Sequence, residues 1–181
     1  GPVGIKPRKY IVDLVSELIC QRQLGLSAED IEETFLLVDE FSQKNIKSYI
    51  EVLPGVEGTL ARLSGSGVYL AVATTDLSRR AEIGLQAGNI EWYFDAIVGG
   101  DQVDKPKPSP DMLIKLMDRF NVLPNETVMV GDAVVDYEMA KAAGVDFIGV
   151  KTGLIEPDFS KTLEAASWVD DMFEVENMLC V

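Results

Sequence analysis

Two aspartates, Asp132 and Asp136, follow the short apolar run TVMVG at residues 127–131. A run of this length and composition predicts a buried strand, and Gly131 lets the backbone turn sharply where the strand ends. Ligands of open α/β sheets bind beyond the carboxyl ends of the strands. Two carboxylates at such a point favour a hard cation such as Mg²⁺, and Mg²⁺ in turn favours a phosphate ligand.

Two other segments place polar groups beside strand ends. Thr74 closes the apolar run VYLAVAT at residues 68–74, and Thr75 follows it. Hydroxyl groups at this point, together with the free N–H groups of the next helix, can hold a phosphoryl oxygen. The segment KPKPSPD at residues 105–111 holds its lysines in a loop that prolines stiffen. A lysine beside a phosphoryl group offsets the charge that develops during phosphoryl transfer.

Each of these residues also has an ordinary structural interpretation. A threonine at a strand end is commonly a turn residue, and a lysine among prolines commonly lies in a solvated loop. Asp132 could cap the helix that follows it, and Asp136 could be a first-turn acid that the helix dipole favours. The order of all these groups, each at the same expected sheet edge, favours one shared phosphate and metal site.

The residues before Leu53 show the apolar spacing of helices. One helix is predicted over residues 9–23. A second begins at Ser27, whose spacing from Asp30 resembles a capping box, and it carries an apolar stripe of Ile31, Phe35, Val38 and Phe41. We therefore expect residues 1–52 to form a helical hairpin.

From Leu53 onward, predicted helices and strands alternate. Strands are expected at residues 68–74, 94–100, 127–131, 146–150 and 167–169, and helices at about 54–64, 77–88, 109–120 and 136–144 and at the C-terminus. Ser109 is the expected cap of the third of these helices, with Pro110 at its first position. Alternation of this kind, with strands apolar throughout, predicts a Rossmann-like α/β core over residues 53–181: a parallel sheet with helices on both faces.

Composition excludes several classes of function. The 181 residues carry a formal net charge of −14, which argues against nucleic acid and anionic membrane surfaces as partners. Histidine is absent, so Ser-His-Asp catalysis and His-ligated zinc are excluded. Cys20 and Cys180 lie far apart without metal-type spacing, no apolar run is long enough for a membrane span, and no secretory signal is visible. A reduced, cytoplasmic protein is expected.

Three segments, in this order along the chain, together resemble motifs of the haloacid dehalogenase superfamily: LPGVEGTLARLSGSGVYLAVATTD, KPSPD and VGDAVVD. The likeness is greatest to phosphatases of the phosphoglycolate phosphatase and β-phosphoglucomutase type, and it covers residues 53–175. The residues before Leu53 are similar to the tail of the helical cap that closes over the substrate in this family.

The resemblance implies a role for each candidate residue. Thr74 would be the hydroxyl residue of the second motif, binding phosphate together with Thr75, which stands where relatives commonly have Asn. Lys107 rather than Lys105 would be the motif lysine, with a catalytic and phosphate-binding role. Asp132 and Asp136 would hold Mg²⁺.

The DxDGT motif of the family, whose first Asp is the nucleophile and whose second is the acid/base, does not occur in this sequence. Asp13 in YIVDLVSEL and Asp39 in FLLVDEF are weak substitutes, because Val15 and Phe41 stand at the position of the second Asp and both runs have helical spacing. We expect that the chain alone does not turn over phosphate esters.

The resemblance places the missing strand between the strands that end at Thr74 and Gly131. These strands could pair directly, the N-terminal segment could supply a strand, or another chain could fill the gap. We therefore expect self-association or strand complementation. Three functions stay open: a Mg²⁺-dependent phosphatase of small phosphorylated metabolites, a non-catalytic protein that binds a phosphate ligand or a protein partner, and a structural domain without metal.

Overall fold

The computed structural model describes residues 15, 17, 26–45, 50–152 and 167–179. The predicted helix over residues 9–23 and the weak nucleophile candidate Asp13 lie outside, or almost wholly outside, these described residues. The account below concerns the described part of the chain.

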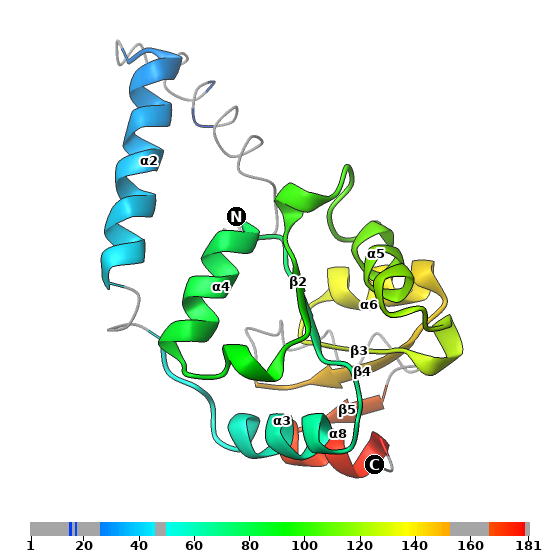
Figure 1. Cartoon of the computed structure of the whole chain (residues 1–181). Helices are drawn as coiled ribbons and strands as arrows, with labels where there is room; N and C mark the ends of the chain where they lie inside the picture. Colours follow the sequence, from blue (N-terminus) through cyan, green and yellow to red (C-terminus); the bar gives the residue numbers. More distant parts are fainter. Residues whose placement is uncertain (1–14, 16, 18–25, 46–49, 153–166, 180–181) are drawn as a thin grey trace.

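Helix α2 (Ala28–Asn45) begins with the predicted capping box. The Ser27 hydroxyl donates to Asp30 Oδ2 at 2.7 Å, and the Asp30 amide donates back to Ser27 Oγ at 3.1 Å. The hydrogen bonds that the Ser27 hydroxyl and the Ser27 amide donate to the Asp30 carboxylate lower the pKa of Asp30. Asp39 falls within this helix and not on a strand, so it does not occupy the position of a strand-borne nucleophile. Figure 1 shows α2 at one side of the molecule, apart from the layers of the core.

The α/β core alternates strands and helices as predicted. Strands β4 (Asp146–Val150) and β5 (Ser167–Val169) have the predicted bounds, whereas β1 (Ala71–Ala73), β2 (Ala96–Val98) and β3 (Val128–Gly131) are shorter than predicted. The helices are α3 (Val56–Gly65), α4 (Ser78–Ala87), α5 (Asp111–Phe120), α6 (Val134–Ala143) and α8 (Met172–Leu179), with short 3₁₀ turns η2 (Glu91–Tyr93), η3 (Gly100–Gln102) and η4 (Pro124–Glu126).

The strands form two parallel sheets and not the single expected one. β1 pairs with β2, and β3, β4 and β5 follow in that order in a second sheet. The prediction that β1 and β3 could pair directly is wrong, because each has only one partner strand in the described part of the chain. β1 and β3 accordingly are not fully buried at any position, whereas β4 is buried at its last three residues.

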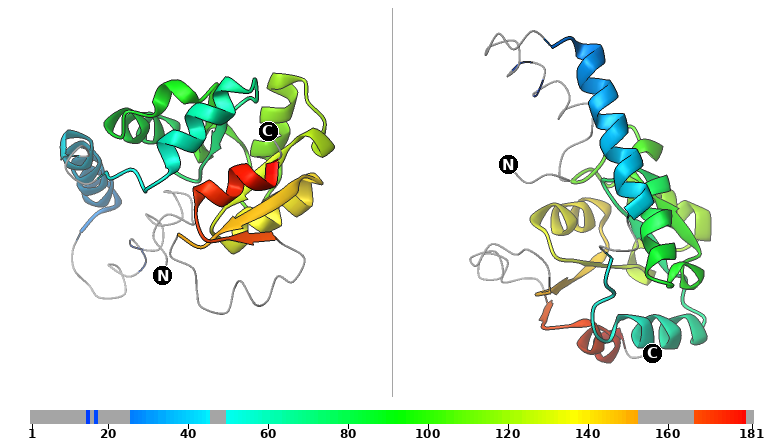
Figure 2. Two further views of the ribbon diagram at one scale, coloured as in Figure 1. Left: turned by 90° about the horizontal axis from the view of Figure 1, so that it is seen from below. Right: turned by 90° about the vertical axis from the view of Figure 1, so that its left-hand side faces the viewer.

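Helices bridge the two sheets. α5 contacts β1 and β2 and also packs on α6, which covers β3 and β4. The core between them includes Met112 on α5 and Met139 on α6, both fully buried. A second pair, α3 and α8, lies side by side (Figure 2) and is joined by ionic contact between Arg62 and Glu176 at 2.6 Å.

Local sequence accounts for most element boundaries. α5 ends at Asn121 and α6 at Gly144, both in the left-handed conformation that suits these residues. The start of α5 differs from the prediction, because Pro110 takes the cap position and the Ser109 hydroxyl donates to the Asp111 carboxylate at 2.5 Å. α6 begins two residues before Asp136, which therefore lies in its first turn.

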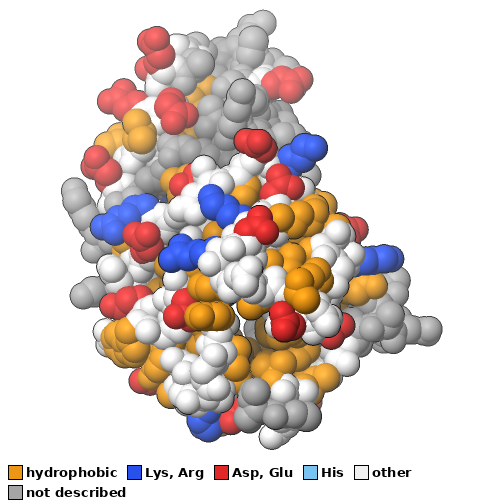
Figure 3. Space-filling view, turned by 45° about the vertical axis from the view of Figure 1, so that its right-hand side comes forward, with side chains coloured by type: hydrophobic (Ala, Val, Ile, Leu, Met, Phe, Trp, Pro, Cys, Tyr) orange, Lys and Arg blue, Asp and Glu red, His pale blue; other side chains and the backbone are white. Residues whose placement is uncertain are grey.

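The surface agrees with the charge analysis. Figure 3 shows a face on which Lys and Arg side chains are scattered among acidic and apolar ones and form no basic stripe. Within the described residues, no helix is both long and apolar enough to cross a bilayer.

We expect Met112→Ala to destabilise the protein by about 2–5 kcal/mol, because it removes a fully buried side chain from the layer that spans both sheets. Ile114→Ala on the same helix is the control, since Ile114 is 44% exposed and should lose less than about 1 kcal/mol. Urea unfolding followed by circular dichroism measures both. Equal losses for the two variants would contradict this description of α5.

Candidate active site

A buried ion pair joins the proline-rich loop to α6. Lys107 Nζ lies 2.6 Å from Asp136 Oδ1, and the two side chains are 10% and 7% exposed. The other carboxylate oxygen, Oδ2, accepts a hydrogen bond from the Ala133 amide at 3.2 Å. Asp136 is thus both a first-turn acid of α6 and the partner of Lys107. Lys105, two residues earlier, is exposed, and its amide donates to Asp111 at 3.3 Å.

Gly131 is required for this arrangement. A Cβ atom at Gly131 would lie 2.6 to 2.8 Å from the side-chain atoms of Asp136, which is closer than real contacts allow. The absence of a side chain therefore lets the Asp136 carboxylate pack against the end of β3. The glycine that the sequence analysis assigned to a turn also makes room for the ion pair.

Asp132 immediately follows β3 and is half-buried. The alternative that it caps the next helix is wrong. Ala133 holds the N-cap position of α6, and the Asp136 carboxylate accepts the hydrogen bond of the Ala133 amide. Within the described residues, no hydrogen bond or ion pair engages the Asp132 carboxylate. Asp132 therefore offers free oxygen atoms at the sheet edge, whereas both oxygens of Asp136 are already bound.

Thr74 lies at the carboxyl end of β1, on the other sheet. Its amide donates to the Val98 carbonyl at 3.0 Å, and its hydroxyl oxygen accepts from the Asp76 amide at 3.1 Å. The hydroxyl therefore still has a proton to donate. The structure brings Lys107 and Asp136 into contact, but none of the hydrogen bonds of Thr74 reaches that pair. Thr75, the next residue in the turn, is half-buried.

The sequence analysis missed Asp101, which lies in the turn after β2. Its Oδ1 accepts hydrogen bonds from both the amide and the hydroxyl of Ser78, each at 2.7 Å, at the start of α4. A signal was available, because VGGD at residues 98–101 resembles VGD at residues 130–132. Partial burial raises the pKa of Asp101, but the hydrogen bonds from Ser78 outweigh this effect and hold the pKa below its usual value.

An exposed ion pair follows the neighbouring strands. Lys151 comes directly after β4, and its Nζ lies 2.6 Å from Oδ1 of Asp170, which comes directly after β5. The hydrogen bond to Asp170 raises the pKa of Lys151. The separation equals that of the buried pair, but these side chains are 45% and 72% exposed.

The donor set suits a hard cation in part. Mg²⁺ binds carboxylate oxygens and commonly uses one or two of them, keeping several waters. Asp132 provides free carboxylate oxygens, and Asp136 adds a second carboxylate at the same strand end. Among the described residues, no group of three or more potential protein ligands is assembled. The residues therefore fit an incomplete Mg²⁺ site rather than a complete one.

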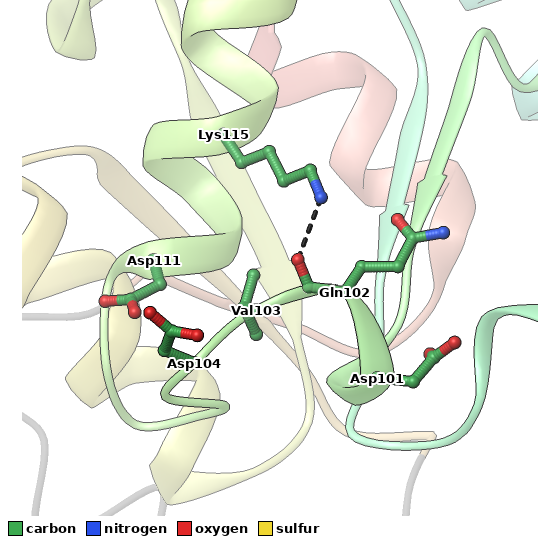
Figure 4. A pocket seen from close by; sticks show the side chains of 6 residues that line it. All are labelled: Asp101, Gln102, Val103, Asp104, Asp111 and Lys115. Carbon is green, nitrogen blue, oxygen red and sulfur yellow. Dashed lines mark hydrogen bonds between the residues drawn. The ribbon is translucent and has the colours of Figure 1, made fainter.

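A shallow cavity lies elsewhere. It has a volume of about 430 Å³ and is lined by η3, by the segment that follows it, including Asp104, and by Asp111 and Lys115 of α5 (Figure 4). It contains none of the predicted site residues. We place the candidate site at the ends of β1 and β3 because the ion pair, the free carboxylate and the hydroxyl of Thr74 lie there.

Comparison with known proteins identifies the family. The sequence profile of the family described as Haloacid dehalogenase-like hydrolase matches residues 13–150, which is more than half of the chain. This protein belongs to that family.

Individual relatives agree with this assignment. The chain is 42% identical to the "Probable phosphatase IndB" of Dickeya dadantii over 68% of this chain and 54% of that protein. It is 29% identical to a "Phosphoglycolate phosphatase" of Pseudomonas putida over 84% of this chain and 58% of that protein. A crystal structure of a predicted phosphoglycolate phosphatase from Haemophilus somnus superposes with a TM-score of 0.81 at 23% identity, covering 98% and 79% of the two chains, which shows the fold. The chain spans less than two thirds of the length of both curated relatives.

We expect Lys107→Met to destabilise the protein by about 3–5 kcal/mol, because it leaves the buried Asp136 carboxylate without its partner. Lys151→Met is the matched control: it breaks an ion pair of the same length at exposed positions and should cost less than about 1 kcal/mol. Urea unfolding at pH 7 measures both. A cost below about 1 kcal/mol for Lys107→Met would mean that the pair does not hold the loop to α6.

Proposed function

We propose that this chain is the metal- and phosphate-binding part of a Mg²⁺-dependent phosphatase that acts on phosphate monoesters of small metabolites. Membership of a hydrolase family supports the reaction class. The names of the relatives, a probable phosphatase and a phosphoglycolate phosphatase, support phosphorylated metabolites as the substrate class. The observation that carries the proposal is the buried Lys107–Asp136 pair, together with the free carboxylate of Asp132 directly after β3.

Each residue has a distinct task in this proposal. Asp132 binds the ion, and Asp136 contributes charge beside it while orienting Lys107. The ammonium group of Lys107 offsets the negative charge of the transferred phosphoryl group. Thr74 donates a hydrogen bond from its hydroxyl group to a phosphoryl oxygen, and Thr75 contributes to the same phosphate site as part of the turn. The bound Mg²⁺ would neutralise phosphate charge.

The described residues do not supply a nucleophile. We infer that the nucleophilic carboxylate comes from an additional strand, as the family resemblance implies, and that the chain alone is inactive. Such a strand between β1 and β3 would join the sheets in the order β2, β1, added strand, β3, β4, β5. Its carboxyl end would then lie between Thr74 and Asp132, where the phosphate is proposed to bind.

Within the described residues, one edge of β1 has no partner strand, which supports a role for an added strand. The Thr74 amide donates to Val98 on β2. Because backbone groups alternate along a strand, the N–H and C=O of Ala73 face the opposite edge. Unpaired groups of this kind form a template for another strand.

An apolar groove lies against the same strand. It has a volume of about 340 Å³ and is lined by Val72 of β1, Thr74 directly after β1, one face of α4, and the segment that leads into α3. Val72 and Thr74 point to the same side of β1 because they are two residues apart. An extended apolar segment would bury this surface while pairing with the edge. We propose that a second copy or another chain supplies it.

We expect Mg²⁺ to raise the melting temperature of the protein. At ten times its Kd the ion would stabilise the fold by about 1.4 kcal/mol, which corresponds to a shift of about 3–5 °C for a chain of this size. Asp132→Asn should abolish the shift, because it removes the free carboxylate. Differential scanning fluorimetry with increasing MgCl₂ measures this effect.

Asp118→Asn is the control for metal binding, because Asp118 is an exposed acid on α5 and should leave the Mg²⁺ shift intact. If excess Mg²⁺ produced no shift in the unaltered protein, or the same shift in Asp132→Asn, the metal site would be wrong.

We expect the purified chain not to hydrolyse p-nitrophenyl phosphate, since binding groups without a nucleophile cannot form a covalent intermediate. We also expect light scattering to give a mass above the 19.8 kDa of one chain, and hydrogen exchange to show a protected Ala73 amide, because a neighbouring strand would cover it.

Four other results would change this view. Mg²⁺-dependent hydrolysis that Asp132→Asn abolishes would overturn the inactivity of the single chain. A monomer whose Ala73 amide exchanges freely would contradict strand complementation, whereas a monomer with a protected Ala73 amide would place the strand within the chain. Phosphate binding without turnover in every assembly state would favour the second candidate function, a non-catalytic phosphate-binding protein, which the incomplete set of metal ligands supports.

A further inference from the structure

The turn after β1, residues 74–77, is hydrogen-bonded at several points to the turn after β2. Hydrogen bonds connect the two segments repeatedly: Thr74 N to Val98 O at 3.0 Å, Gly100 N to Asp76 O at 2.9 Å, and Ser78 N and Oγ to Asp101 Oδ1 at 2.7 Å each. The turn that contains Thr74 and Thr75 therefore takes its position from a neighbouring segment.

Glycines bring the two turns unusually close. A Cβ atom at Gly100 would lie 2.7 Å from the Thr75 carbonyl oxygen, and one at Gly99 would lie 2.4 Å from the Ser78 amide nitrogen. A residue with a Cβ atom at either position would collide with the backbone of the other turn, so both positions require glycine. The turn after β1 therefore cannot move closer to the turn after β2. If its hydrogen bonds break, it can only move away from that turn.

Asp101 provides the cap that α4 lacks in its own sequence. Leu77 holds the N-cap position and makes no side-chain cap, so the early amides of the helix need an external acceptor. The Asp101 carboxylate fills this role for Ser78, which is only 5% exposed. A carboxylate at this end is also favoured by the helix dipole.

Asp101 is itself anchored from the other side. Lys115 on α5 donates to the Gln102 carbonyl at 2.8 Å, which fastens η3 to α5. Figure 4 shows this bond and shows Asp101 on the opposite side of η3 from Asp104 and Asp111. The carboxylate is therefore presented to α4 by a fixed support, and Asp101 also lines the cavity that contains Asp104 and Asp111.

We propose that Asp101 is a positioning residue of the phosphate site: by capping α4 at Ser78, its carboxylate holds the turn from Thr74 to Leu77 in the conformation that binds phosphate. This inference rests on the proposed function, because it assigns the phosphate to that turn. Asp101 touches no substrate in this role and acts through the backbone of the turn.

The capping hydrogen bonds lower the pKa of Asp101. The folded-state pKa therefore lies below that of the unfolded chain, so the stabilisation is complete above about pH 4. It is lost as the pH falls through the lowered pKa. Measurements at pH 7 accordingly compare a fully charged carboxylate with its neutral replacements.

The test uses Asp101→Ala, Asp101→Asn and Gly100→Ala. Amide exchange at Ser78 is followed by NMR, and binding of Mg²⁺ and of inorganic phosphate is followed by calorimetry at pH 7. In Asp101→Ala we expect the Ser78 amide to exchange at least tenfold faster and phosphate to bind about tenfold more weakly. Mg²⁺ should bind unchanged, because Asp132 lies on the other sheet.

The other two variants grade the effect. Asp101→Asn should fall between the unaltered protein and Asp101→Ala, because an amide oxygen still accepts a hydrogen bond. Gly100→Ala should weaken phosphate binding with Asp101 intact, because it pushes on the Thr75 carbonyl.

Arg62→Met controls for a general loss of stability. It removes the ionic contacts of Arg62 with Glu176, which are 2.6 Å long, join α3 to α8 and involve no residue of the turn. We expect it to change the phosphate Kd by less than twofold even where its melting temperature falls as much as that of Asp101→Ala.

The outcomes separate this inference from the proposed function. Unchanged exchange at Ser78 in Asp101→Ala would overturn the capping role, and faster exchange with an unchanged phosphate Kd would overturn the positioning role. A failure of the unaltered protein to bind phosphate would instead overturn the proposed phosphate site, and the exchange measurement would still decide whether Asp101 holds the turn.

Discussion

The buried ion pair between Lys107 and Asp136 fastens the loop that follows the β1–β2 sheet to the carboxyl edge of the β3–β4–β5 sheet. A buried charge must be paired, so the loop has one favourable position, and Gly131 makes room for it. The carboxylate of Asp132, which follows the same strand as Gly131, makes no hydrogen bond or ion pair within the described residues.

The separation of the two sheets shapes the rest of the molecule. Helices α5 and α6 on one side, and α3 and α8 as a second pair, connect elements that belong to different sheets. The residues proposed to act on phosphate are divided accordingly, with Thr74 on one sheet and Asp132 on the other. A strand that paired with both β1 and β3 would complete the hydrogen bonding of two edges and bring the divided site together.

Much of the fold was predictable because its signals are local. Short apolar runs located all five strands, and the pattern of Ser27 and Asp30 located the start of α2. Boundaries that depend on neighbours were less predictable. Ser109 does not cap α5, since its hydroxyl binds the Asp111 side chain. Helix α6 begins before Asp136, whose carboxylate accepts a hydrogen bond from the Ala133 amide at the start of the same helix.

The sequence by itself determined the types of chemical group and their order at the strand ends: a hydroxyl at Thr74, a lysine among prolines, and two aspartates after Gly131. Only the tertiary structure decided how they are used. It pairs Lys107 with Asp136, leaves Asp132 free, and recruits Asp101 to hold the turn at Ser78. These contacts join residues 23 and 29 positions apart. Local patterns cannot specify them, because they depend on how the helices bring two sheet edges together.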